Sequence, residues 1–599
     1  MATKVLLLLP VVYVVLWVGE TKTVSVSTKI GVINGQVEDV TFLDKSATIH
    51  TFLGIPFAEP PIGNLRFKKP LPKTPLKDPL NAFKHNNACL PGIKGLLESK
   101  RLKYDEDCLY LNIYAPELNE EEKPLAVMVW IYGGGFILGF SDMYLGHHLA
   151  THGRVIVVTL NYRLSVWGFL STGDEHAPGN YGLWDQHLGI KWVHDNIAAF
   201  GGDPNRVTIF GESAGSASVF HQTLYPGNKG LFQRAIGQSG SVGNFWGLNE
   251  KNKENANKIG NLANCKTDGS ESLVNCLRQV PVEELSDFVC NFKYGLLTYP
   301  FSFLPTHDGD FVKTDPKRVF DKDNDMPSEV ADFFSSLDVM TGVTSGEGSI
   351  GITPFVTGIT DAENFTTNKT FFVETLVPST IGKVFGETVP KVAEHIVISE
   401  YTNWENPDDE NNIREEFISM FGDVSFTKDL YVTLNAHSKL STHQHTYMYL
   451  FEIVPEYSGF LQPPSWFKKF IHAGDLPFVF GFVNSDQLED EFHAKPVKWE
   501  IQLSADVMTI WSNFAKTGNP NFPSDLGLDW IPYTRKHQHY LQISRDMTSA
   551  NVKQRWNTRR ANFLENILPR IVKAAQCNEQ KYSENLNQET CDKDNSCSP

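Results

Sequence analysis

The sequence predicts an α/β fold in which a large, mostly parallel central sheet is flanked by helices and preceded by a small group of antiparallel strands. Two observations predict this fold class. Buried apolar runs alternate along the chain with helical patterns, which is typical of a parallel sheet covered by helices on both faces. The composition is also globular, with 41% hydrophobic and 21% charged residues, so a chain of 599 residues can bury a sizeable core.

The strand candidates justify the sheet in chain order. Residues 28–67 are rich in β-branched residues and turn signals such as Asn34-Gly35, and they predict short antiparallel strands. A helical pattern over Trp184–His194 lies between two of the later candidates. No repeat or Pro/Ser-rich linker interrupts the series, so we expect one domain over residues 20–575, followed by a polar tail over 576–599. The strands expected in the parallel sheet are Leu125–Tyr132, Val155–Leu160, Arg206–Phe210, Ala235–Ser239, Val339–Val343, Thr446–Phe451 and His539–Ile543.

The amino end predicts a secretory signal peptide over about residues 1–19. Lys4 supplies a positive charge, Val5–Val18 is almost wholly apolar, and Gly19 is a small residue near a cleavage point. The apolar run is shorter than the roughly 20 residues that a membrane-spanning helix needs. No later segment predicts a transmembrane anchor, so we expect a secreted protein.

Charge and histidine spacing exclude other classes of partner. The net charge of −17 argues against a nucleic-acid partner, because binding phosphates requires a basic face. His443 and His445 lack a third metal ligand nearby and are better interpreted as surface histidines. We therefore expect neither a metal nor another cofactor.

Two further patterns fit the secretory route. Glycosylation sequons begin at Asn364 and Asn368. Eight cysteines in an oxidising compartment favour disulfides. Cys89 with Cys108, and Cys265 with Cys276, each enclose a short polar segment, but spacing alone does not fix connectivity. The pairing of the remaining cysteines stays open, and those in the tail allow a bridge within the tail or to a second chain in a homodimer: Cys290, Cys577, Cys591 and Cys597.

The segment FGESAG at residues 210–215 predicts a catalytic serine. It follows an expected strand and precedes a helix-like stretch over 216–224, which is the context of a nucleophile elbow. Gly211 and Gly215 suit a sharp turn in which a side chain would crowd the backbone. Ser213 also stands at a helix N-terminus, which favours developing negative charge.

A serine hydroxyl needs a base and an orienting acid, and the downstream sequence offers both. Glu347 follows the expected strand Val339–Val343 in a glycine-flanked loop, where catalytic groups collect in open α/β sheets. His472 lies in a loop of small residues between apolar stretches, so its ring can reach a cleft. Upstream, Gly133–Gly135 follow a buried strand and allow backbone N–H groups to form an oxyanion hole.

With these motifs the chain resembles the type-B carboxylesterases of the cholinesterase/carboxylesterase family over nearly its whole mature length. That resemblance implies the α/β-hydrolase fold and hydrolysis of a small-molecule ester through an acyl-enzyme. Besides FGESAG, the matching stretches are FLGIPFA from Phe52, EDCLYLN from Glu106, YGGGF from Tyr132, GNYGLWDQ from Gly179 and AFGGDPN from Ala199.

The resemblance also assigns roles to individual positions. It implies that Ser213 is the nucleophile, Glu347 the acid and His472 the base, and that the disulfides are Cys89–Cys108 and Cys265–Cys276. The family's third internal disulfide is absent, since no cysteine lies between Cys290 and Cys577. The other implied positions are the oxyanion hole (Gly134, Gly135 and Ala214), a secondary hydrogen-bond network with the histidine (Ser239 and Asp475) and an acyl-pocket aromatic (Trp246).

One departure from the family bears on the substrate. Cholinesterases carry a tryptophan, which binds quaternary ammonium, in the loop between the first two disulfide cysteines. Here the loop Leu90–Asp107 has Tyr104 as its only aromatic residue, which argues against a choline ester. We expect a carboxylesterase or neutral lipase acting on apolar, lipid-like or xenobiotic esters. The alternative is a non-catalytic adhesion or recognition protein of the same fold.

Overall fold

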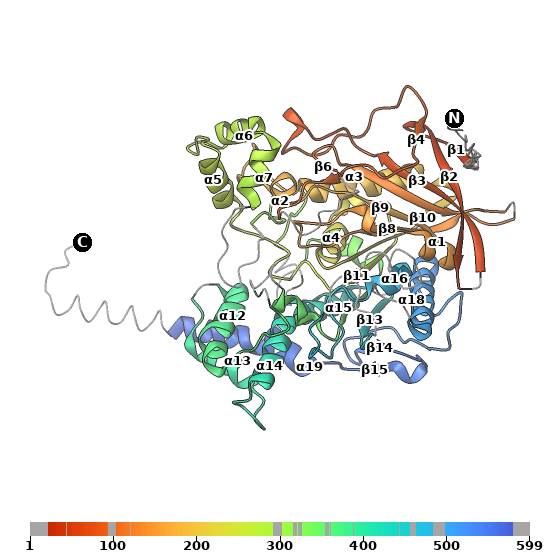
Figure 1. Ribbon diagram of the computed structural model, residues 1–599. Helices are drawn as coiled ribbons and strands as arrows, with labels where there is room; N and C mark the ends of the chain where they lie inside the picture. Colours follow the sequence, from red (N-terminus) through yellow and green to blue (C-terminus); the bar gives the residue numbers. More distant parts are fainter. Residues whose placement is uncertain are drawn as a thin grey trace, which may run out of the picture.

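The computed structural model describes residues 22–43, 45–93, 103–119, 121–290, 302–315, 320, 326–353, 359, 361–386, 388–441, 444–455, 463–482 and 497–578. Within these ranges thirteen strands form one sheet in the order β1-β2-β3-β7-β9-β8-β10-β11-β12-β13-β14-β15, with β4 (Leu80–Asn81) paired to β2 (Figure 1). The predicted signal peptide, His443, Cys591 and Cys597 lie outside the described residues.

The amino-terminal strands form an antiparallel meander of β1 (Thr23–Thr28), β2 (Gly31–Phe42) and β3 (Lys45–Pro56). The antiparallel arrangement was predicted, but the expected short strands were wrong, since β2 and β3 have 12 residues each. The dipeptide Asn34-Gly35 lies inside β2 and not in a turn. The reason is packing: a Cβ on Gly35 would lie 2.5 Å from the Phe52 ring of β3.

The central part of the sheet is parallel, as predicted from the alternating pattern. The strands that were not predicted include β7 (Tyr110–Pro116), antiparallel to both β3 and β9, and β15 (Val552–Gln554). Asn112 interrupts the apolar pattern of β7, and its amide bonds with Ser141 and Thr159 in the interior. The parallel strands are β8 (Leu125–Ile131), β9 (Ile156–Leu160), β10 (Gly202–Glu212), β11 (Arg234–Gln238), β12 (Asp338–Thr344), β13 (Thr446–Phe451) and β14 (His539–Ile543).

The strand order changes direction between β8 and β10. After β8 the chain continues to β9 on one side, whereas after β10 it continues to β11 on the other. Such a switch point opens a crevice beyond the carboxyl ends of the two strands, where α/β proteins bind ligands. The expected site residues follow β8, β10 and β12 at this edge of the sheet.

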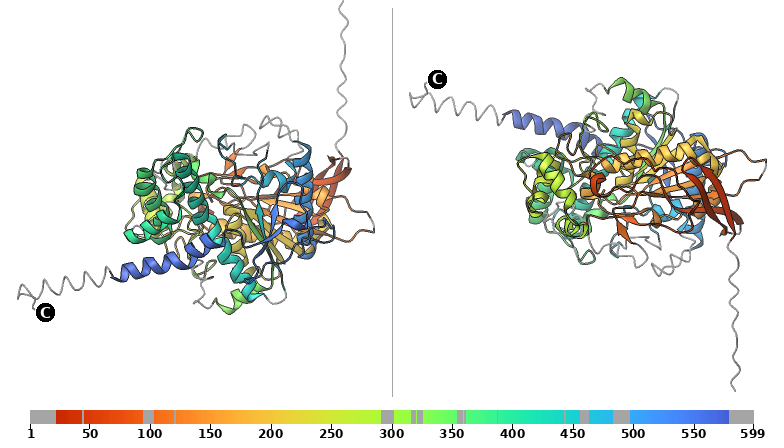
Figure 2. Two further views of the ribbon diagram at one scale, coloured as in Figure 1. Left: turned by 90° about the horizontal axis from the view of Figure 1, so that it is seen from below. Right: turned by 90° about the horizontal axis from the view of Figure 1, so that it is seen from above.

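Helices surround the sheet, and the predicted helix over 184–194 lies within α3. Besides the core around the sheet, a second apolar cluster lies among α12, α13 and α14. These helices and α19 form a group on the side of the molecule away from β1–β4 (Figures 1 and 2). The larger helices are α1 (His147–Gly153), α3 (Tyr181–Asn196), α4 (Ala214–Thr223), α5 (Asn252–Leu262), α6 (Ser270–Gln279), α7 (Val282–Cys290), α9 (Ser328–Ser335), α12 (Val377–Phe385), α13 (Lys391–Glu400), α14 (Glu410–Gly422), α15 (Lys428–Leu440) and α18 (Lys498–Thr517), and the shorter ones include α2 (Ser165–Phe169), α16 (Leu476–Phe480) and α19 (Thr558–Asn562).

None of the helices in the described ranges combines the length and the apolar character that crossing a membrane requires.

Candidate active site

Ser213 occupies the sharp turn between β10 and α4. Its backbone has φ 56° and ψ −121°, a strained conformation for a residue with a side chain, and its N–H donates to the Gln238 carbonyl at 2.8 Å. The flanking glycines are required by close packing: a Cβ would lie 2.5 Å from the Ile131 carbonyl oxygen at Gly211 and 2.0 Å from it at Gly215. The sequence thus places Ser213 at the N-terminus of α4, beside the end of β8.

His472 and Glu347 form a buried pair near this turn. Glu347 begins a 3-10 turn after β12, and His472 follows β13 in the loop before α16. The Nδ1 atom of His472 lies 2.6 Å from Oε2 of Glu347, and both side chains are almost fully buried. The backbone N–H of His472 donates to Oγ of Ser349, which fixes the loop. The two residues selected from the sequence are therefore in direct contact.

The other ring nitrogen of His472 faces Glu212, the residue before Ser213. Nε2 lies 3.1 Å from Oε1 of Glu212. Within the described residues no hydrogen bond joins the Ser213 hydroxyl to His472, although sequence order places Ser213 beside that carboxyl group. Catalytic hydrogen bonds are often long in the absence of substrate and tighten when it binds.

Burial and neighbouring charges shift the ionisation of this cluster. Burial raises the pKa of Glu212 to about 8, assisted by the charges of Asp475 and Glu347 and opposed by His472. For His472 burial acts in the opposite direction, but the carboxylates of Glu212 and Glu347 outweigh it and raise the pKa to about 9. Glu212 is thus the group whose charge most strongly favours the imidazolium form of His472.

Ser239 and Asp475 hold parts of the site through different partners. The Ser239 hydroxyl donates to Oε1 of Glu347 at 2.5 Å. Asp475 instead accepts a bond from Nε2 of Gln238 at 2.7 Å, and burial raises its pKa to about 6. Trp511 donates in turn to the Gln238 side chain at 3.2 Å. The sequence did not predict Gln238, because only the pairing of β11 with its neighbours brings it to the site.

The glycine turn after β8 lies directly against the Ser213 turn. A Cβ on Gly133 would lie 2.9 Å from Oε2 of Glu212 and 3.1 Å from Cβ of Ser213. Gly134 and Gly135 have φ values of 99° and 63°, in the left-handed region that favours glycine. Across the described part of the chain, the N–H groups of Gly134, Gly135 and Ala214 have no backbone acceptor. The assignment of these three N–H groups to an oxyanion hole stays a prediction.

An aromatic wall stands beside His472. Trp246 is buried, and its Nε1 donates to the Ser425 carbonyl at 3.0 Å. The ring of Phe426 lies between Trp246 and His472, with centroid distances of 5.5 Å and 4.7 Å respectively. The resemblance suggested Trp246, but nothing in the sequence indicated Phe426, which comes from a helix far along the chain.

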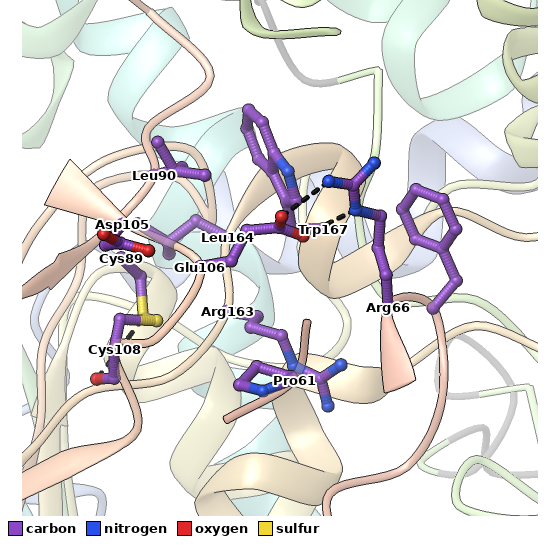
Figure 3. Close-up of a pocket in the computed structure, with 11 residues that line it drawn as sticks. Pro61, Arg66, Cys89, Leu90, Asp105, Glu106, Cys108, Arg163, Leu164 and Trp167 are labelled. Carbon is purple, nitrogen blue, oxygen red and sulfur yellow. Dashed lines mark hydrogen bonds and ion pairs between the residues drawn. A yellow bond between two sulfur atoms is a disulfide. The ribbon is translucent and has the colours of Figure 1, made fainter. Parts of the chain in front are cut away.

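A separate, small pocket lies beside the Cys89–Cys108 loop (Figure 3). Its wall includes Leu90, Trp167 from α2, and the ion pair between Arg66 and Glu106, which are 2.6 Å apart. The loop itself contains no tryptophan, but Trp167 places an indole ring beside it. The described residues that line the pocket do not include Ser213, Glu347 or His472, so it is distinct from the candidate active site.

The remaining predicted positions lie away from the site. Cys89–Cys108 and Cys265–Cys276 both form disulfides, with Cα separations of 5.0 Å and 5.8 Å. His445 lies 3.6 Å from Asp338 at the amino end of β12. The other positions are exposed: Asn364, Asn368 and Cys577.

A serine at a strained strand-to-helix turn, next to a buried carboxylate–histidine pair at the sheet's switch point, defines the class of α/β-hydrolases. Within that class the chain belongs to the carboxylesterase family, which matches residues 22–564. The protein is therefore a carboxylic ester hydrolase.

Similarity to individual relatives extends over most of the chain. It is 33% identical to acetylcholinesterase of Bungarus fasciatus over 572 residues, covering 93% of this chain and 88% of that protein. It is 34% identical to bile salt-activated lipase of Bos taurus over 564 residues, with coverages of 90% and 86%. For the bile salt-activated lipase of Rattus norvegicus the identity is 35% over 493 residues, with coverages of 78% and 74%.

Proposed function

We propose that this hydrolase cleaves apolar or lipid-like carboxylic esters through an acyl-enzyme formed on Ser213. The observation that carries the proposal is the buried His472–Glu347 pair, 2.6 Å apart, beside the strained Ser213 turn. Glu347 accepts a hydrogen bond from Nδ1–H of His472 and orients the ring, which leaves Nε2 as the base toward the Ser213 side. Ser213 attacks the ester carbonyl as His472 takes its proton, and water repeats the steps on the acyl-enzyme.

The tetrahedral intermediate needs donors for its negative oxygen. We assign this role to the N–H groups of Gly134, Gly135 and Ala214, which lack backbone acceptors within the described residues. A preorganised donor of this kind contributes about 3 kcal/mol to the stability of the transition state. The N-terminus of α4 adds a favourable dipole at the same place.

The preference for an apolar acyl group follows from the aromatic wall. Phe426 is buried beside His472, Trp246 is buried against Phe426, and the two rings offer carbon surface to an acyl chain. Two relatives are named as lipases, which supports a lipid-like substrate, whereas a third is named as an acetylcholinesterase. The described residues of the Cys89–Cys108 loop contain no tryptophan, which supports a lipid-like substrate over a choline ester.

A series of esters tests the substrate class. We expect kcat/KM to rise from p-nitrophenyl acetate to the butyrate and octanoate, because each added methylene buried against the aromatic wall strengthens binding by about 0.8 kcal/mol. Acetylthiocholine is a cationic thioester with the same acetyl group, and we expect it to be cleaved more slowly than the neutral acetate. Faster cleavage of acetylthiocholine than of any neutral ester would contradict the proposed substrate class.

We also propose that the protein is secreted and glycosylated. Its two disulfides suit an oxidising compartment. Asn364 and Asn368 are exposed, and the side-chain oxygen of Asn368 caps α11 (Lys369–Phe371) by accepting from the Phe371 N–H, so its amide nitrogen remains outside that bond.

The pH dependence of hydrolysis tests the role of Glu212. The acid limb of kcat/KM reports the pKa of the base in the free enzyme. Glu212→Gln removes a carboxyl group 3.1 Å from His472 whose ionised form raises the pKa of His472, so the substitution lowers that pKa. We expect the acid limb to move to lower pH by about one unit. Glu394→Gln, which alters a buried carboxylate in α13 that pairs with Lys391, is the control. An unchanged or upward-shifted limb in Glu212→Gln contradicts the assignment of Glu212 as the group that raises the pKa of His472.

A further inference from the structure

One long helix packs against the candidate active site and contains a π-helical turn in its middle. It comprises α14, the turn η7 (Asp423–Thr427) and α15. The Lys428 N–H bonds to the Asp423 carbonyl, five residues earlier, which is the π-helical pattern. All five side chains of η7 are buried. A π-turn inserted into an α-helix is uncommon and is frequently found at functional sites.

The turn η7 holds the aromatic wall in place. The Ser425 carbonyl accepts two side-chain bonds, from Nε1 of Trp246 at 3.0 Å and from Nδ2 of Asn244 at 2.7 Å. Phe426, the next residue, lies with its ring centroid 4.7 Å from that of His472. A shift of η7 therefore moves the aromatic wall of Trp246 and Phe426, and with it the ring that contacts His472.

The residue before η7 contacts the loop that carries Glu347. A Cβ on Gly422 would lie 2.7 Å from the backbone nitrogen of Gly348, and one on Gly348 would lie 1.8 Å from the Ile418 carbonyl oxygen. The backbone of α14 thus lies directly against the residue that follows Glu347. The same short stretch of helix touches the surroundings of both members of the His472–Glu347 pair.

Asp423 fixes this stretch to the carboxyl-terminal part of the chain. Its Oδ1 accepts from Nδ2 of Asn557 at 2.6 Å, and its Oδ2 accepts from the Tyr401 hydroxyl at 3.0 Å. Arg560 lies over the Tyr401 ring at 4.4 Å and bonds Glu416 of α14 at 2.8 Å. Burial raises the pKa of Asp423 to about 6, opposed by the charge of Arg560. Asn557 and Arg560 both belong to the segment around α19, which lies beside α14 (Figure 1).

We propose that Asp423 is a positioning residue, which joins η7 to Asn557 and thereby holds Phe426 and Trp246 in register with His472. The proposal rests on the proposed function, because it assumes that the aromatic wall binds the acyl chain at the candidate active site. A purely structural Asp423 stabilises the fold but does not alter which acyl chain the enzyme prefers. Acyl preference, measured per active site, therefore separates the two roles.

The test compares p-nitrophenyl butyrate and octanoate, with rates normalised to sites titrated by an organophosphate. Asp423→Asn leaves one side-chain oxygen, which can accept from Asn557 or from Tyr401 but no longer from both, so one of the two bonds is lost. We expect kcat to fall about 10- to 100-fold, since small displacements of catalytic groups have effects of that size. We expect the octanoate-to-butyrate ratio of kcat/KM to change by about tenfold, because the acyl wall is released. Adding Asn557→Asp exchanges donor and acceptor across the contact and is expected to restore both values.

Asp338→Asn is the matched control. Asp338 is buried and paired with Arg234 at the amino end of β12, opposite the end that leads to Glu347. It is expected to lower the unfolding temperature without changing the acyl ratio. Should Asp423→Asn fail to fold, the partly exposed Asn557→Ala is used, with a smaller change in the same ratio expected. An unchanged ratio in the folded variant overturns the inference. A parent that is inactive on every ester overturns the proposed function, and this inference with it.

Discussion

Replacing Ser213 with alanine is expected to lower kcat for p-nitrophenyl butyrate by a factor on the order of 10⁶, the size of effect that loss of a serine nucleophile produces. Alanine removes the oxygen that forms the acyl-enzyme, and no other side chain can take its place at the turn. The residual rate reflects the glycine turn and substrate binding alone. Rates are measured with and without an organophosphate, which is expected to inhibit the parent only.

Ser216→Ala is the matched control on the same helix. Ser216 lies three residues after Ser213, and its buried hydroxyl donates to the Gly240 carbonyl at 2.7 Å. It is expected to retain hydrolysis close to the parent and to show a comparable unfolding temperature. Activity of Ser213→Ala within about tenfold of the parent contradicts the assignment of Ser213 as nucleophile.

The Ser213 turn could be predicted from sequence because its requirements are local. An apolar strand, two glycines and a helix-like stretch occur within about twenty residues, and the close contacts at Gly211 and Gly215 explain why those positions hold glycine. The parallel strands were predictable for a similar reason, since each is a continuous apolar run. By contrast, β7 was missed because Asn112 interrupts its pattern, and the partners of Asn112 are distant in sequence.

Other features of the site depend on packing between segments far apart in the chain. The contact of Nε2 of His472 with Glu212, and not with the Ser213 hydroxyl, follows from the relative placement of two loops. Gln238 reaches Asp475 only because β11 and the loop before α16 meet in the fold. Phe426 stands beside His472 because a helix contains a π-turn there, and no spacing in the sequence signals that turn.

Replacing Glu347 with glutamine is expected to lower kcat by about 10⁴, the effect seen when the acid of a comparable triad becomes an amide. The glutamine oxygen can take the place of Oε1 of Glu347, which accepts from the Thr344 N–H at 2.7 Å and from the Ser239 hydroxyl at 2.5 Å. The loop therefore retains its hydrogen bonds. On the other side an NH₂ group then faces Nδ1 of His472. Nδ1 must accept that bond, which places the ring proton on Nε2, where the base is needed.

Ser239→Ala separates this orienting effect from a general loosening of the loop. It removes one bond to Oε1 of Glu347 but leaves Oε2 in contact with His472 at 2.6 Å. We therefore expect a loss of about tenfold, the size that follows from one hydrogen bond to a charged group. If kcat fell no further in Glu347→Gln than in Ser239→Ala, Glu347 would only support the loop, and another residue would have to be the acid of the triad. A larger loss in Glu347→Gln, at an unfolding temperature similar to that of Ser239→Ala, places the effect on the tautomer and charge of His472.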